Sequence, residues 1–229
     1  MNILTALSEK PWEENPNPQM QKAVRERVRI SGLRVLLTVV SVLFFLFIVA
    51  FLMRSQYPDW QPLAEQASHP LYDKTQLWLN SIYLILASVG MQIARMSSRG
   101  TKRQLTKGAL IVAGVFSSAF VAGQLLFWQQ LTAQGFTVDA NPALSFFYLF
   151  TGLHALHVAI GLITWLVALR ITLFSDPTAH AEKINHYIEL CAMYWHFLLG
   201  LWVLLFALLI SKPETYNAIV EFCGLGGGV

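Results

Sequence analysis

Charged residues are scarce in this sequence. They make up 13% of 229 residues, with 16 basic and 13 acidic side chains, whereas 55% of the chain is hydrophobic. An average soluble domain has roughly a quarter of its residues charged. The formal net charge of +3 is too small to indicate a nucleic-acid partner. The composition therefore predicts a membrane protein with no nucleic acid among its partners.

Cysteine and the common cofactor motifs are also scarce. The two cysteines are Cys191, inside an apolar stretch, and Cys223, in a Gly-rich tail, and we expect both to be free thiols. The sequence has no CxxC pair, no CxxCH haem-attachment site, no HExxH pattern and no Gly-rich phosphate loop. These absences argue against a disulfide framework, covalently attached haem and a zinc-peptidase site.

The sequence is rich in long apolar runs. A membrane core of about 30 Å needs roughly 20 helical residues. Five stretches are long enough, and only helices are expected because a lone strand leaves its backbone unsatisfied in lipid. We predict an all-α, polytopic bundle of five transmembrane helices over residues 34–211, after a cytoplasmic segment 1–33 and before an external tail 212–229. The five stretches are 35–53, 77–94, 108–128, 143–174 and 186–210.

The basic residues alternate between the two sides of the predicted membrane. Thirteen of the 16 precede the first stretch, lie in the second-to-third loop, or lie in or just before the fourth-to-fifth loop, and the other three are Arg54, Lys74 and Lys212. Loops rich in Lys and Arg stay in the cytoplasm. We therefore expect a multi-pass protein of the bacterial inner membrane, with its N-terminus cytoplasmic and its C-terminus periplasmic.

Few strongly polar side chains lie inside the predicted spans. His154 and His157, three residues apart, share a face of the fourth span, and Glu189 and His196, seven apart, share a face of the fifth. We expect these two faces to turn toward each other, helped by small residues that let helices approach. The small residues are Gly152, Gly161 and Gly200, and the other candidate members of the polar network are Gln124 and Trp195.

Three roles compete for these groups. Three histidines and one glutamate suit a zinc, iron or copper site, and a carboxylate with a deeper histidine suits the start of a proton relay. No second acid follows farther across the membrane, and the two close histidines cannot hold stacked haems. We therefore favour a structural hydrogen-bond network, with lipid contacts, and predict no catalytic, cofactor-binding or metal-binding residue in this chain.

Two of the helical stretches resemble subunit III of the haem–copper terminal oxidases. The resemblance lies in "FFYLFTGLHALHVAIGLI" (146–163) and "ELCAMYWHFLLGLW" (189–202), with weaker likeness in "LNSIYLILASVGMQIA" (79–94) and "GQLLFW" (123–128). It implies the five-helix form of the family, a subunit without haem or copper of its own. It also implies a catalytic subunit I that carries them, further subunits of the complex, and bound membrane phospholipid.

The sequence departs from this family where acids are usual. Val42 follows Ser41, Phe127 precedes the tryptophan that ends the third stretch, and Leu199 lies three residues after His196. The loss of these acids disfavours proton uptake and favours a scaffold that stabilises the catalytic core of an oxygen-reducing, proton-pumping oxidase using cytochrome c or quinol. A divergent member of this kind also fits an accessory subunit of a nitric oxide reductase system. A free-standing metalloprotein or transporter is a third interpretation.

Overall fold

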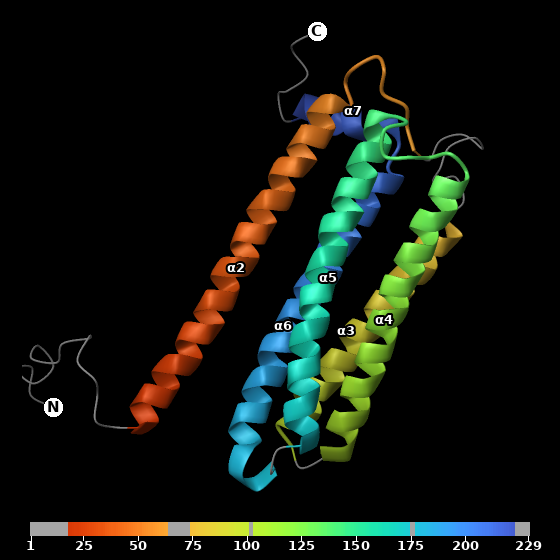
Figure 1. Cartoon of the computed structure of the whole chain (residues 1–229). Helices are drawn as coiled ribbons and strands as arrows, with labels where there is room; N and C mark the ends of the chain where they lie inside the picture. The colour runs from red at the N-terminus through yellow and green to blue at the C-terminus, as the bar shows by residue number, and fades with distance from the viewer. Residues whose placement is uncertain (1–17, 64–73, 101–102, 175–176, 223–229) are drawn as a thin grey trace, which may run out of the picture. The chain divides into compact units, whose positions relative to one another are not determined.

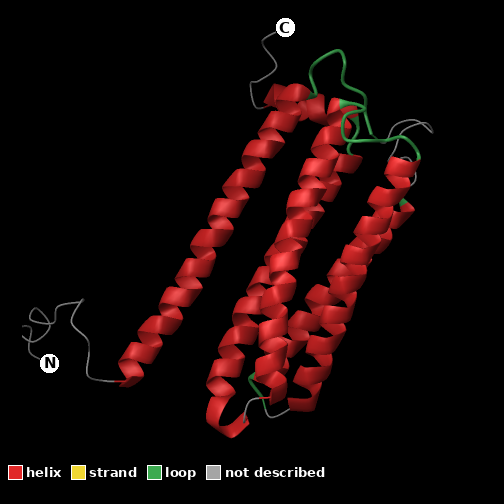
Figure 2. Ribbon diagram, in the orientation of Figure 1, coloured by secondary structure: helices red, strands yellow, loops and turns green. Residues whose placement is uncertain are grey.

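The computed structural model describes residues 18–63, 74–100, 103–174 and 177–222. Over these ranges the chain is helical, with loops between the helices and no strand (Figures 1 and 2). The all-α prediction is therefore confirmed. The helices are α2 (Pro18–Arg54), α3 (Thr75–Ser98), α4 (Arg103–Ala133), α5 (Pro142–Phe174), α6 (Pro177–Ile210) and α7 (Pro213–Phe222).

Five of these helices are long and apolar enough to cross a membrane, as the sequence predicts. The shortest has 24 residues, about 36 Å at 1.5 Å per residue. The helices extend beyond the predicted apolar stretches, because polar residues at their ends continue the helical backbone. The candidate spans are Val24–Arg54, Thr75–Ser98, Arg103–Ala133, Pro142–Phe174 and Ala181–Ile210.

Local sequence signals determine where α4 ends and α5 begins. The backbone N–H of Leu144 donates to Asn141 Oδ1 at 3.0 Å, so Asn141 caps α5 directly before a proline at the first helical position. At the end of α4, Gly135 has a φ of 87° and the N–H of Phe136 donates to the Leu131 carbonyl at 3.0 Å. Gly135 thus ends α4 in a left-handed backbone conformation, which glycine adopts more readily than other residues, and the chain turns toward α5.

The chain divides into two compact units, residues 1–38 and 39–229. Within the first, residues 18–38 are the amino-terminal part of α2. Within the second, α3 packs on α4 and α6, and α5 packs on α4 and α6, so that these four helices form a closed ring of neighbours. Three of the six predicted site residues, His154, Gln124 and Trp195, are buried in these helices.

Close helix contacts in the ring rely on two glycines of α4. A Cβ on Gly114 would lie 1.9 Å from Cζ2 of Trp165 in α5, and one on Gly123 would lie 2.3 Å from Oδ1 of Asn80 in α3. Trp165 also donates its indole N–H to the Leu110 carbonyl of α4 at 2.8 Å. The lack of a side chain at these positions therefore lets α3 and α5 approach α4 closely.

An aromatic cluster joins the carboxyl-terminal half of α2 to α5 and α7. The ring of Phe51 lies 5.0 Å from Trp60, 5.6 Å from Phe146 and 5.3 Å from Tyr216, measured between centroids. Tyr216 of α7 also donates its hydroxyl to the Leu208 carbonyl at 2.9 Å, and burial raises its pKa to about 12. Helix α7 lies in the predicted tail, where the sequence pattern does not indicate a helix.

Candidate functional site: a polar network between membrane helices

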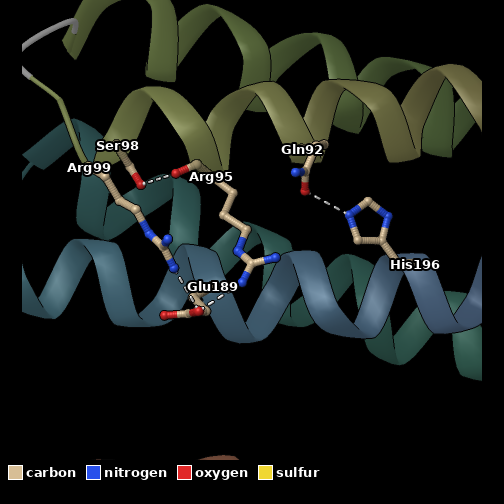
Figure 3. A network of polar contacts seen from close by, with 6 residues as sticks. All are labelled: Gln92, Arg95, Ser98, Arg99, Glu189 and His196. Carbon is tan, nitrogen blue, oxygen red and sulfur yellow. Dashed lines mark hydrogen bonds and ion pairs between the residues drawn. The ribbon is translucent and has the colours of Figure 1, made fainter.

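His196 of α6 makes two hydrogen bonds to side chains of α3. Its Nδ1 lies 2.6 Å from Ser88 Oγ. Its Nε2 lies 3.0 Å from Gln92 Oε1, as Figure 3 shows. Because a carbonyl oxygen only accepts, Nε2 carries the proton and Nδ1 accepts from the Ser88 hydroxyl. Ser88 and Gln92 are four residues apart and therefore share a face of α3. Both nitrogens of this half-buried ring are thus satisfied by one neighbouring helix.

Glu189 of α6 bridges two arginines of the same helix α3. Its Oε1 accepts from Arg95 Nη2 and from Arg99 Nη2, each at 2.9 Å (Figure 3). Two arginines four residues apart on a helix repel each other, and a shared carboxylate offsets that repulsion. The Glu189 side chain is 30% exposed, so each pair contributes roughly 0.2–1 kcal/mol at most. Two cations against one anion leave a local excess of positive charge.

The expectation that the polar faces of the fourth and fifth spans meet is therefore wrong for Glu189 and His196. Seven-residue spacing places both on one face of α6, as predicted, but this face turns to α3. α3 offers Glu189 and His196 a hydroxyl, an amide and two guanidinium groups at helical spacing.

His154 is the inner of the two histidines on α5 and has no exposed surface. Its ring lies 5.2 Å from the Trp202 ring of α6 and 5.8 Å from the Phe120 ring of α4, edge to face with the latter. Within the part of the chain that the structure describes, neither ring nitrogen has a hydrogen-bond partner. A buried polar group in this condition is costly.

His157 contacts a different helix from His154. Its Nδ1 lies 2.6 Å from the Leu153 carbonyl of its own helix, to which it donates, and its ring packs edge to face on Phe44 of α2 at 5.7 Å. The His157 carbonyl in turn accepts from the Tyr194 hydroxyl of α6 at 3.0 Å. Three-residue spacing therefore puts the two imidazoles on one side of α5 without joining them to a common ligand.

The other two predicted residues lie in the core. Gln124 of α4 accepts from Asn80 Nδ2 of α3 at 3.2 Å, and both side chains are buried. Trp195 is also buried in α6. Of the small residues expected beside the network, Gly161 lies against Tyr194, because a Cβ added to this glycine would be 3.1 Å from the Tyr194 ring. Gly152 and Gly200 instead face open space.

Sequence reasoning missed the arginine partners of Glu189. Loop charge explains Arg95 and Arg99 by membrane orientation alone, although their four-residue spacing at the end of a span is suited to pairing with an intramembrane acid. Among the described residues, no group of three or more His, Cys, Asp or Glu side chains is placed to hold a metal ion. What the arrangement can do is hold helices in register.

The helical spans and the polar side chains between them define a multi-pass membrane protein whose intramembrane polar groups mostly pair within the chain. The family model described as cytochrome c oxidase subunit III matches residues 13–211. The chain belongs to the cytochrome c oxidase subunit III family and is thus a membrane subunit of a respiratory-chain oxidase of the cytochrome c or quinol type. The resemblance in the two histidine-containing stretches is therefore confirmed.

Three curated relatives illustrate the relation. Cytochrome c oxidase subunit 3 of Synechocystis is 30% identical over 183 residues, 79% of this chain and 74% of the relative. The protein of that name from Thermostichus vulcanus is 30% identical over 184 residues, 79% of this chain and 86% of the relative. Cytochrome bo(3) ubiquinol oxidase subunit 3 of Pseudomonas putida is 25% identical over 140 residues, 61% and 66% respectively.

Proposed function

We propose that this chain is a non-catalytic subunit that stabilises the catalytic subunit of a bacterial haem–copper oxidase. In this proposal the complex reduces oxygen to water and pumps protons, and haem and copper are held by partner subunits. The chain lies in the inner membrane with its N-terminus in the cytoplasm and its C-terminus in the periplasm.

The observation that carries the proposal is the internal use of the intramembrane polar groups. Glu189 and His196 both bond to α3, and Gln124 bonds to Asn80. These contacts hold α3, α4 and α6 of one chain together. A subunit of this kind contributes a rigid, apolar surface to a larger complex.

Phospholipid binding is the second part of the proposal. Arg95 and Arg99 carry more positive charge than Glu189 neutralises, and the Arg99 side chain is 60% exposed. Under the proposed orientation, this excess lies at the cytoplasmic end of α3, where the leaflet is rich in anionic headgroups. The chemistry is therefore suited to an anionic phospholipid.

Purification of the complex through a tag on this chain tests the structural role. We expect Glu189→Gln to lower the yield of co-purified catalytic subunit several-fold, because both arginines then face each other without a neutralising charge. The haem spectrum of the complex that does assemble should stay as in wild type. Glu221→Gln, an exposed acid of α7, is the matched control and should leave the yield unchanged.

A normal yield of complex with a lost haem signal would contradict the structural role. Oxygen and nitric oxide consumption by the purified complex separates an oxidase from a nitric oxide reductase system. Stoichiometric metal in the isolated chain would favour the free-standing metalloprotein, and substrate uptake by vesicles that contain this chain alone would favour a transporter.

A further inference from the structure

Several buried side chains of the four-helix ring have unused hydrogen-bonding capacity, and His154 and Gln124 are two of them. His154 of α5 lacks a partner at both ring nitrogens, and Gln124 of α4 lacks one at Nε2, within the described residues. Their residue exposures are 0% and 1%. A neutral imidazole has one donor and one acceptor, and the Gln124 amide nitrogen has two donors. Buried groups of this kind are nearly always satisfied, by protein or by ordered water.

A series of neighbouring residues connects the two side chains. Phe120 lies one helical turn before Gln124 on α4, and its ring contacts both His154 and Trp202, with centroids 5.8 and 5.0 Å apart. Trp202 in turn donates its indole N–H to Ser81 Oγ at 2.9 Å. Asn80, which directly precedes Ser81, donates to Gln124. The unpaired groups therefore belong to one buried cluster that draws on all four helices of the ring.

Hydrogen-bonded side-chain amides connect this cluster to the amino-terminal end of α3. Gln76, in the first turn of α3, is half-buried, and its Nε2 lies 3.5 Å from Asn80 Oδ1. Asn80 Nδ2 then donates to Gln124 Oε1 at 3.2 Å. Side-chain amides thus form a hydrogen-bonded series from a partly exposed position to the buried Gln124.

We propose that the four-helix ring binds an internal water molecule between the His154 imidazole and the Gln124 amide. Water is the ligand that suits the site because it both donates and accepts, and buried waters typically make about three hydrogen bonds to otherwise unpaired groups. A side chain of another protein cannot reach His154, which has no exposed surface. This proposal concerns the interior of the chain and does not depend on the proposed function.

X-ray radiolysis of the purified complex in ¹⁸O-water tests for the bound water directly. Radiolysis of an ordered water oxidises the side chains next to it, even where bulk solvent has no access. Phe120 and Phe147 are both 0% exposed, but Phe147 packs on Phe127 and Tyr148 instead of His154. We expect several-fold more ¹⁸O at Phe120 than at Phe147, together with oxidation of Trp202. Equal labelling of the two phenylalanines would overturn the proposal.

Variants link the labelling to the named groups. His154→Phe keeps a ring against Trp202, and Gln124→Met keeps the chain length of the side chain without its amide. Each should reduce the labelling of Phe120 to the level of Phe147. Gln130→Met, at an exposed position of the same helix, should leave it unchanged. Labelling that persists in both His154→Phe and Gln124→Met would place the water elsewhere and contradict the assignment.

Thermal unfolding gives a second readout with opposite expected signs. If His154 is dry and unpaired, an apolar ring in its place removes a buried unsatisfied group and raises the Tm. If a water joins it to Gln124, His154→Phe leaves the amide unpaired and lowers the Tm. We expect the fall, and a rise would overturn the proposal even if the labelling experiment were ambiguous.

Discussion

At the residue scale, the glycines of the membrane helices differ sharply in what surrounds them. The sequence indicates small residues near the histidines as contact points, but Gly152 faces open space, whereas Gly114 lies against Trp165. A helical glycine without a neighbour costs up to about 1 kcal/mol relative to alanine. The same residue at a close helix contact is required because any side chain would collide with the neighbouring helix.

Alanine substitution at these two glycines should therefore have opposite effects. Gly114→Ala places a Cβ 1.9 Å from the Trp165 ring, and the indole must move. Such overpacking typically costs about 1–3 kcal/mol, so we expect a lower Tm in purified protein. Gly152→Ala meets nothing within 4 Å and should leave the Tm unchanged or raise it. A Gly114→Ala protein as stable as wild type would show that α4 and α5 are not held at this contact.

At the element scale, periodicity predicts the helices well and their neighbours poorly. The Asn-Pro start of α5 and its end at Phe174 follow from capping and apolar length. The seven-residue spacing of Glu189 and His196 places them on one face, but spacing carries no information on which helix that face meets. The face of α6 meets α3 because Arg95 and Arg99 bind Glu189. These arginines are far from Glu189 in the sequence, so the spacing within α6 does not predict the ion pairs.

The tail helix α7 is not predicted from the sequence for a different reason. Its ten residues are too few for a membrane span and carry no long apolar run. What stabilises it is tertiary: Tyr216 and Val220 are buried, and the Tyr216 ring packs on Phe51. Isolated helices of this length are marginal in water, so contacts that are distant in sequence decide whether the helix forms.

An acid-sensitive contact joins the end of the first span to the segment that follows it. Arg54, the last residue of α2, forms a two-pronged ion pair with Asp59, including Nη1 to Oδ1 at 2.8 Å, and this hydrogen bond lowers the pKa of the Asp59 carboxyl. A lowered pKa contributes stability above the unfolded-state pKa of about 3.9, and that stability is lost as the pH falls through the lowered value.

Hydrogen exchange in the segment 55–63 measures this contact. At neutral pH, Asp59→Asn should exchange faster than wild type there, because the charge on the arginine has lost its partner. As the pH falls below the lowered pKa of Asp59, the two proteins should become indistinguishable. An acceleration in Asp59→Asn that is equally large at all pH values would show that shape, and not charge, holds the segment.

At the scale of the whole molecule, polar and charged groups follow two separate patterns. Inside the spans, they pair between helices, as at His196 and Glu189. Toward the ends of the spans and in the segments beyond them, 13 of the 16 basic residues lie at positions that alternation of the five helices places on one side. The first pattern concerns how the helices of one chain pack. The second predicts how the chain is oriented in the membrane.

The two native cysteines allow this orientation to be measured with little engineering. Cys191 is buried in α6, so a membrane-impermeant maleimide should not reach it. Cys223 lies outside the described residues, in the predicted periplasmic tail. In right-side-out vesicles we expect wild-type protein to be labelled at Cys223. The variant Gly100→Cys/Cys223→Ser, with its thiol in the exposed turn after α3, should react only in inverted vesicles. The asymmetry of the basic residues predicts that the two thiols react from opposite sides of the membrane. Labelling of both thiols from the same side would contradict an odd number of membrane crossings between them.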